Sequence, residues 1–245
     1  MVILSNLSGK SRALYVQKMF GQIASKYDLL NRLMTGGQDI NWRKVVVEKL
    51  SPKPDAWYLD NGAGTGDLAY AILSKEPHAG IVAADFTFEM ISVGRLRPCQ
   101  EKIYWVVADA ENLPFRGSVF KGVVSGFLLR NVSDPRRAMG EQVRVLETGG
   151  NIVTLDTTPP KSGLLQPIIW VHLHIVIPLL GKLVAGSAEA YTYLPDTTEK
   201  FMTAEKLALL IENSGLCAVG FVRKMFGTVA IHWGKKPDVL SDPPA

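Results

Sequence analysis

The chain has 245 residues, of which 47% are hydrophobic and 20% are charged, a balance that suits a globular domain and excludes a disordered chain. The net charge of +4 is too small to indicate a nucleic-acid partner. The positive excess lies in residues 1–50, which have eight basic and three acidic side chains. Cys99 and Cys217 are too few for a disulfide framework, and the first residues lack a signal-peptide pattern, so we expect a cytoplasmic protein.

The first predicted elements are two helices, at residues 12–34 and 39–50. Apolar side chains recur at helical spacing in both stretches, and Gly36-Gly37 separates them. We expect residues 1–50 to form an N-terminal helical cap.

Short apolar runs separated by helix-like stretches follow the cap. They lie at residues 57–60, 81–85, 103–109, 121–127 and 151–156. This alternation predicts an α/β fold, in which a doubly wound, Rossmann-like parallel sheet has helices on both faces. We expect residues 56–157 to form a cofactor-binding core.

Residues 158–214 are predicted to be a helical insertion on the substrate side. No charged residue occurs from Ser162 to Gly181, and twenty residues are long enough to span a bilayer. The stretch nevertheless contains prolines and polar side chains, which favours a core or interfacial helix over a true span. His172 and His174 are two residues apart and therefore not on one helix face, so we expect interfacial polar positions and no metal site.

The last elements are a helix over residues 203–213, with Thr203 as its N-cap, and two apolar runs at 216–224 and 227–234. The runs predict an antiparallel strand pair, at residues 215–236, that closes one edge of the sheet. No internal repeat or linker divides the chain, so residues 1–245 are expected to form one domain.

A glycine-rich loop, with Gly62, Gly64 and Gly66, lies between the first apolar run and a helical stretch. Such a loop lets the backbone turn sharply and approach a ligand closely. Residues 64–69 also fit the dinucleotide pattern G-x-G-x-x-A, so a nicotinamide-dependent oxidoreductase remains an alternative function. Asp85 ends the second run, where a carboxylate can accept ribose hydroxyls with either cofactor, and Asp109-Ala110 ends the third, where an adenine can be held.

In order along the chain, these motifs resemble those of class I S-adenosylmethionine methyltransferases. More narrowly, the chain resembles the UbiE-type C-methyltransferases of ubiquinone and menaquinone biosynthesis over about residues 16–236. Further residues that carry this resemblance are Met19-Phe20, Lys26-Tyr27-Asp28-Leu29, Asn31, Leu113-Pro114-Phe115, Leu129-Arg130-Asn131-Val132, Leu183-Val184-Ala185, Tyr191 and Gly227-Thr228-Val229-Ala230-Ile231-His232. The fold that it implies has a seven-stranded sheet with an antiparallel last strand and helical caps.

The resemblance also implies roles for the cofactor-side residues. Gly62, Gly64 and Gly66 would receive the methionine end of S-adenosylmethionine, Asp60 and Thr65 would line it, Asp85 would hold the ribose, and Asp109 with Ala110 the adenine. Where the family has a serine near the cofactor, this chain has Gly126, or the serine is displaced to Ser125.

Methyl transfer to a ring carbon needs alignment of donor and acceptor, and ionisation of a quinol hydroxyl makes the carbon nucleophilic. A guanidinium stays protonated, so Arg130 would stabilise the phenolate or orient a water that Asn131 fixes. The hydroxyl of Tyr27 and the imidazole of His232 are secondary catalytic candidates. Each has a simpler alternative, because Tyr27 can pack the cap and His232 lies in an apolar strand.

The resemblance implies a lipophilic quinol substrate whose prenyl tail lies in the bilayer. We therefore expect the protein to act as a peripheral protein at the inner face of the membrane. A basic residue near an anionic surface contributes about 1 kcal/mol, so the N-terminal charge could aid this binding. The alternative is that this charge only forms a solvated helix face. A methyltransferase of soluble small molecules and a non-catalytic cofactor-binding protein stay as alternatives. A homodimer is a further possibility for the oligomeric state.

Overall fold

The computed structural model describes residues 9–160, 163, 166–185 and 189–238. Within these residues, a seven-stranded sheet has the strand order β3-β2-β1-β4-β5-β7-β6. The strands are β1 (Trp57–Asn61), β2 (Gly80–Asp85), β3 (Ile103–Val107), β4 (Phe120–Gly126), β5 (Leu146–Thr157), β6 (Cys217–Lys224) and β7 (Val229–Lys235). Strands β1 to β5 pair in parallel, and β7 is antiparallel to both β5 and β6. This confirms the predicted α/β sheet with an antiparallel last strand.

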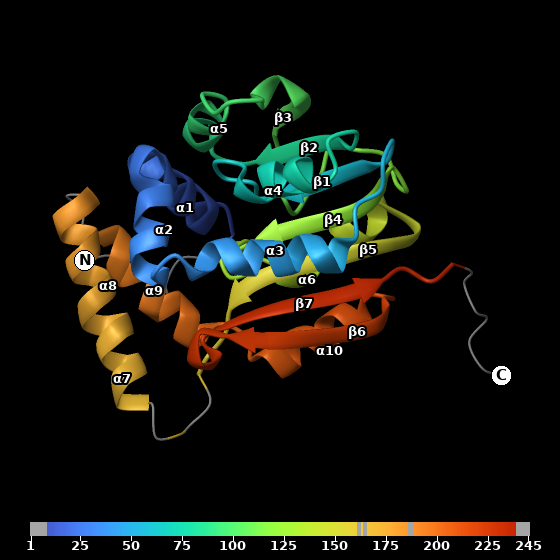
Figure 1. Cartoon of the computed structure of the whole chain (residues 1–245). Coiled ribbons are helices and arrows are strands. Elements are labelled where there is room, and N and C mark those ends of the chain that lie inside the picture. Colours follow the sequence, from blue (N-terminus) through green and yellow to red (C-terminus); the bar gives the residue numbers. More distant parts are fainter. Residues whose placement is uncertain (1–8, 161–162, 164–165, 186–188, 239–245) are drawn as a thin grey trace.

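Helices cover both faces of the sheet (Figure 1). They are α1 (Gly9–Ile23), α2 (Tyr27–Thr35), α3 (Gln38–Leu50), α4 (Asp67–Lys75), α5 (Phe88–Gly94), α6 (Pro135–Val145), α7 (Gln166–Val171), α8 (Ile177–Leu180), α9 (Glu189–Lys200) and α10 (Ala204–Asn213). Side chains of α3 and α4, such as Val46 and Ile72, are buried against one face, and those of α6 and α10, such as Met139 and Leu207, against the other. Thr203 caps α10 as predicted, because its Oγ1 accepts a hydrogen bond from the Lys206 N–H at 3.3 Å.

Helices α1 and α2, together with α7 to α9, gather at the end of the sheet where β1, β2 and β4 finish (Figure 1). The helix expected over residues 12–34 is divided there, because a 3-10 turn (Ala24–Lys26) separates α1 from α2. The turn lets Ile23 of α1 and Leu30 of α2 face one buried cluster, which also contains Met90 of α5. These helices form a second, smaller core beside the carboxyl ends of the strands.

The apolar stretch forms a helical segment over residues 166–185, named here the apolar segment. It consists of α7, a π-helical turn (His172–Val176), α8 and a second π-helical turn (Gly181–Ala185). Pro178 has no N–H to donate to the preceding turn, which is consistent with the departure from α-helical bonding beside it. In the described part of the chain, one stretch is long and apolar enough to cross a membrane, namely Gln166–Leu183, and 22% of it is buried.

Candidate active site

The glycine-rich loop joins β1 to α4, and its three glycines all have positive φ angles. Gly66 has a φ of +85°, and a Cβ atom there would lie 2.6 Å from Trp105, so both the backbone and the packing require glycine. Gly64 has a φ of +58°, and its N–H donates a hydrogen bond to Oδ2 of Asp85 at 2.7 Å. The end of β2 therefore fixes the loop after β1.

A pocket, called the loop pocket here, opens beside this loop at the carboxyl ends of β1 to β4. Its lining includes Gly62, Gly64, Asp85, Asp109, Ala110, Glu111 and Asn131. Burial raises the pKa of Asp85, whose carboxylate also accepts the Thr87 N–H at 2.7 Å. Asp109 is exposed, with Oδ1 accepting the Glu111 N–H at 2.9 Å. The structure thus brings together residues from the ends of four strands that lie far apart in the sequence.

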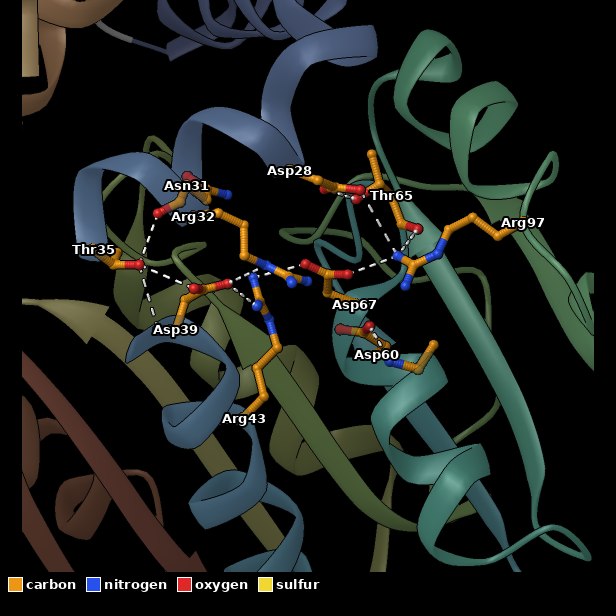
Figure 2. Close-up of polar contacts among 11 residues, drawn as sticks. Asp28, Asn31, Arg32, Thr35, Asp39, Arg43, Asp60, Thr65, Asp67 and Arg97 are labelled. Carbon is orange, nitrogen blue, oxygen red and sulfur yellow. Dashed lines mark hydrogen bonds and ion pairs between the residues drawn. The ribbon is translucent and has the colours of Figure 1, made fainter. Parts of the chain in front are cut away.

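Asp60 and Thr65 line a small recess that shares Gly62 and Gly64 with the loop pocket. Asp60 is buried, and its Oδ2 accepts the Ala69 N–H at 2.9 Å, while Oδ1 has no partner among the described residues. Burial raises the pKa of Asp60 to about 7. Thr65 directs its hydroxyl to Asp28 of α2, donating to Oδ1 at 2.6 Å (Figure 2).

A network of charged side chains ties the cap to the glycine-rich loop (Figure 2). Asp67, the first residue of α4, lies 2.7 Å from Arg43 of α3 and 2.6 Å from Arg97. Arg43 also pairs with the buried Asp39. The sequence gives no signal for this network, because its members lie on α3, on α4 and in the loop after α5 and carry no motif.

A second pocket, called the cap pocket here, lies between the sheet and the helices α1, α2 and the apolar segment. Most of its lining is apolar, including Met19, Ile23, Met34, Trp42, Leu173 and Ile177. Arg130 enters it from the connection after β4, with its guanidinium held by Asp156. Tyr27 and Phe127 line both pockets, so the two adjoin at these rings.

The predicted catalytic residues are not all in one place. Arg130 lines the cap pocket, whereas Asn131 lines the loop pocket and donates from Nδ2 to the Phe127 carbonyl at 2.7 Å. Tyr27 lies where the pockets meet, and burial raises the pKa of its hydroxyl. It therefore stays protonated at neutral pH and acts as a hydrogen-bond donor there.

Two other predicted residues lie away from both pockets. Ser125 is fully buried between β4 and β5, where its Oγ donates to Thr154 Oγ1 at 3.1 Å. His232 lies between β7 and α10, where its Nε2 donates to the Ala204 carbonyl at 2.9 Å. Burial lowers the pKa of His232 to about 4, so it is neutral at physiological pH. Neither side chain is among the residues that line the loop pocket or the cap pocket.

Several pocket residues had no role in the sequence analysis. From the sequence, Asp156 is predicted only to end a strand and His172 only to be an interfacial residue. The sequence gives no signal for Thr198. All three belong to the surroundings of the cap pocket, which is assembled from segments far apart in the chain. Asn31 also lines it, one helical turn after Tyr27, and that i, i+4 spacing was the one available signal.

Comparison with known proteins gives a consistent result. Residues 8–236 match the family described as the ubiE/COQ5 methyltransferase family. The ubiquinone/menaquinone biosynthesis C-methyltransferase UbiE of Desulfotalea psychrophila is 41% identical over 90% of each chain. The demethylmenaquinone methyltransferase of Thermus thermophilus is 38% identical over 89% of this chain and 100% of that protein.

Solved structures support the fold. The phosphoethanolamine N-methyltransferase 2 of Haemonchus contortus, solved with phosphomonomethylethanolamine and S-adenosylhomocysteine, superposes with a TM-score of 0.61 at 14% sequence identity. The match covers 80% of this chain and 52% of that chain. At this identity the likeness concerns the arrangement of sheet and helices.

Proposed function

We propose that this chain, which belongs to the ubiE/COQ5 methyltransferase family and is an S-adenosylmethionine-dependent methyltransferase, methylates a ring carbon of a polyprenylated quinol in quinone biosynthesis. The substrate is a quinol of the demethylmenaquinol or the 2-methoxy-6-polyprenyl-1,4-benzoquinol type. The names of the relatives support both types of ring, since one relative is named for ubiquinone and menaquinone biosynthesis and another for demethylmenaquinone. The oxidoreductase alternative is not favoured by this family membership.

The loop pocket fits S-adenosylmethionine. Asp85 has both carboxylate oxygens fixed by backbone N–H groups, which leaves further lone pairs to accept ribose hydroxyls. Asp109 and Ala110 lie where the adenine would be held, and the unpartnered Oδ1 of the buried Asp60 lies in the adjoining recess, where it would receive the amino group of the methionine end. When bound, S-adenosylmethionine supplies an electrophilic methyl group. The protein holds it beside Tyr27 and Phe127.

The observation that carries the proposal is the contact of an apolar pocket with the cofactor pocket at Tyr27 and Phe127. A quinol ring in the cap pocket would lie next to the donor site, where the two pockets adjoin. Arg130, held by Asp156, would stabilise the negative charge that develops on a ring oxygen. The mostly apolar lining lowers the local dielectric, so this interaction would be stronger than it is in solution.

The direct test measures methyl transfer to short-tailed demethylmenaquinol and to the matching benzoquinol, both kept reduced, by mass spectrometry. We expect one added methyl group on carbon, formed only with S-adenosylmethionine present. Methylation of soluble phenols with equal efficiency would favour the soluble-substrate alternative. Cofactor binding without transfer to either ring would favour a non-catalytic protein.

We also propose that the apolar segment docks on the membrane surface that holds the prenyl tail. Ile169, Leu173 and Ile177 are buried in the cap, whereas apolar side chains on its other side are exposed. The exposed ones are Ile168, Trp170, Val171, Ile175, Val176, Leu179 and Leu183. A helix fixed to the protein along one side and apolar on the other suits an interfacial position, parallel to the bilayer.

A further inference from the structure

Several buried polar atoms of the cap pocket have no hydrogen-bond partner within the described residues. They are Asn31 Nδ2, Arg130 Nε, Thr157 Oγ1, His172 Nε2 and Thr198 Oγ1. Burying an unpaired polar atom costs about 1–3 kcal/mol, and folded proteins rarely leave several in one place. Five such atoms around one apolar pocket indicate a ligand with its own polar atoms, as a quinol ring with two oxygens has.

His172 differs from the other four residues in the chemistry that it offers. The guanidinium of Arg130 and the amide nitrogen of Asn31 only donate hydrogen bonds, and a threonine hydroxyl is a very weak base. A neutral imidazole nitrogen accepts a proton near neutral pH. Since burial keeps Tyr27 protonated, His172 is the one residue among the described lining of the cap pocket that can take a proton from a quinol hydroxyl.

We propose that His172 is the catalytic proton acceptor for the quinol, an inference that rests on the proposed function and deepens it. The ring O–H bond breaks and its proton moves to Nε2 of His172, in the tautomer with its own proton on Nδ1. The oxygen electrons increase the nucleophilicity of the ring carbon, which takes the methyl group, and the electron pair of the broken S–CH3 bond stays on sulfur. The methylated ring carbon then loses its hydrogen as a proton to solvent. The imidazolium of His172 returns its proton to the ring oxygen.

Thr198 supports this assignment from a second element. It lies on α9 with 1% of its surface exposed, and its unpartnered Oγ1 faces the same pocket as His172 on the apolar segment. We expect it to hydrogen-bond the ring oxygen that His172 deprotonates. The insertion, which the sequence analysis assigned to the substrate side, thereby supplies both groups.

The ionisable groups around His172 come from several elements. Arg130, from the connection after β4, and Tyr27, from α2, are the other ionisable side chains in the described lining of the cap pocket. Asp156 lies behind Arg130, and on the outer side His174 pairs with Glu199 of α9 at 3.4 Å. The guanidinium of Arg130 would stabilise the phenolate that the proton transfer produces.

The test compares His172→Gln with His174→Gln. His174 lies on the same segment but does not line the cap pocket. With short-tailed demethylmenaquinol, we expect His172→Gln to lower kcat about 10²-fold or more, because general-base catalysis contributes about 10²–10⁴-fold. The pH profile of kcat should differ from that of the wild type, and the affinity for S-adenosylhomocysteine should stay unchanged. His174→Gln should retain both rate and profile. A wild-type rate and pH profile in His172→Gln would overturn the proposal.

A binding measurement separates this inference from the proposed function. With S-adenosylhomocysteine present, the wild type should bind 1-naphthol at least about 5-fold more tightly than 1-methoxynaphthalene, since only the first can donate to Nε2. His172→Phe should lose that preference. If the wild type keeps the preference but methylates no quinol, the proposed function fails and the hydroxyl-binding role of His172 stands. If the preference survives in His172→Phe, the inference itself is wrong.

Discussion

Arg130 and Asp156 form a buried ion pair, with Nη1 of the arginine 2.8 Å from Oδ1 of the aspartate. The aspartate is fully buried, and 6% of the arginine side chain is exposed. Burial raises the pKa of Asp156 above its ordinary value, and the guanidinium opposes that rise. Because the backbone N–H of Arg130 also donates to Asp156, the pair fixes the position of the guanidinium in the cap pocket.

Arg130→Met should lower methyl transfer about 10²-fold or more, as the loss of a group that stabilises developing charge does. Cofactor affinity should change little, because Arg130 lines the cap pocket and not the loop pocket. The variant should also lose about 3–5 kcal/mol of stability, since Asp156 is left as an unpaired buried charge. Turnover, calorimetry and denaturant unfolding measure the three effects.

The double variant Arg130→Met/Asp156→Asn separates the catalytic from the structural role. Removing both charges should restore part of the stability while activity stays low. Recovery of near wild-type turnover together with stability would show that Arg130 serves only the fold.

Asp85→Asn should weaken the binding of S-adenosylhomocysteine about 10-fold or more. Two backbone N–H groups donate to this carboxylate, at 2.7 Å each, and an amide cannot accept both with its nitrogen facing one of them. The ribose hydroxyls would also lose a charged acceptor, which is worth about 1.5–3 kcal/mol per hydrogen bond. Calorimetry measures the change, with the exposed Glu101→Gln as control. An unchanged dissociation constant would contradict the ribose assignment.

The strand ends could be predicted because parallel strands place their carboxyl ends at one edge of a sheet. The position of Asp85 and Asp109 beside the glycine-rich loop follows from that geometry alone. Ser125 shows the limit of the same reasoning. The backbone of Gly126 lines the loop pocket, whereas the side chain of its neighbour Ser125 is buried in the sheet, where it pairs with Thr154.

The cap pocket could not be predicted, since its lining depends on how helices pack and not on a local pattern. Whether His172 or His174 faces inward depends on the rotation of the apolar segment over the cap. Apolar residues cover the whole circumference of that segment, so hydrophobic periodicity gives no signal for the rotation. The buried positions of Leu173 and Ile177 fix it in the structure.

The stability of the protein should depend on His232 between pH 7 and pH 4. The folded pKa of His232 is about 4, and the unfolded value is about 6.5, so the unfolded chain binds an additional proton within this range. The neutral imidazole therefore makes its full contribution to the free energy of unfolding above pH 7. This contribution is lost as the pH falls from 7 toward 4. The stability advantage of the wild type over His232→Gln should narrow by about 2 kcal/mol from pH 7 to pH 5. Urea unfolding at both pH values measures this, and an unchanged difference would contradict the buried neutral histidine.

Ile175→Glu/Leu179→Glu should abolish the binding of the protein to vesicles of phosphatidylcholine and phosphatidylglycerol. Both side chains are about half exposed, and full burial of such a side chain is worth about 1.5–3 kcal/mol. Replacing both apolar side chains should therefore weaken vesicle binding about 10²-fold or more. Leu209→Glu is a matched control, since Leu209 is exposed to a similar extent but lies on α10. Flotation measures binding, and turnover of a short-tailed quinol in solution should stay the same in all three proteins. If the wild type does not float but sediments as a dimer that the double variant loses, a second copy of the chain covers this face, and the membrane proposal is wrong.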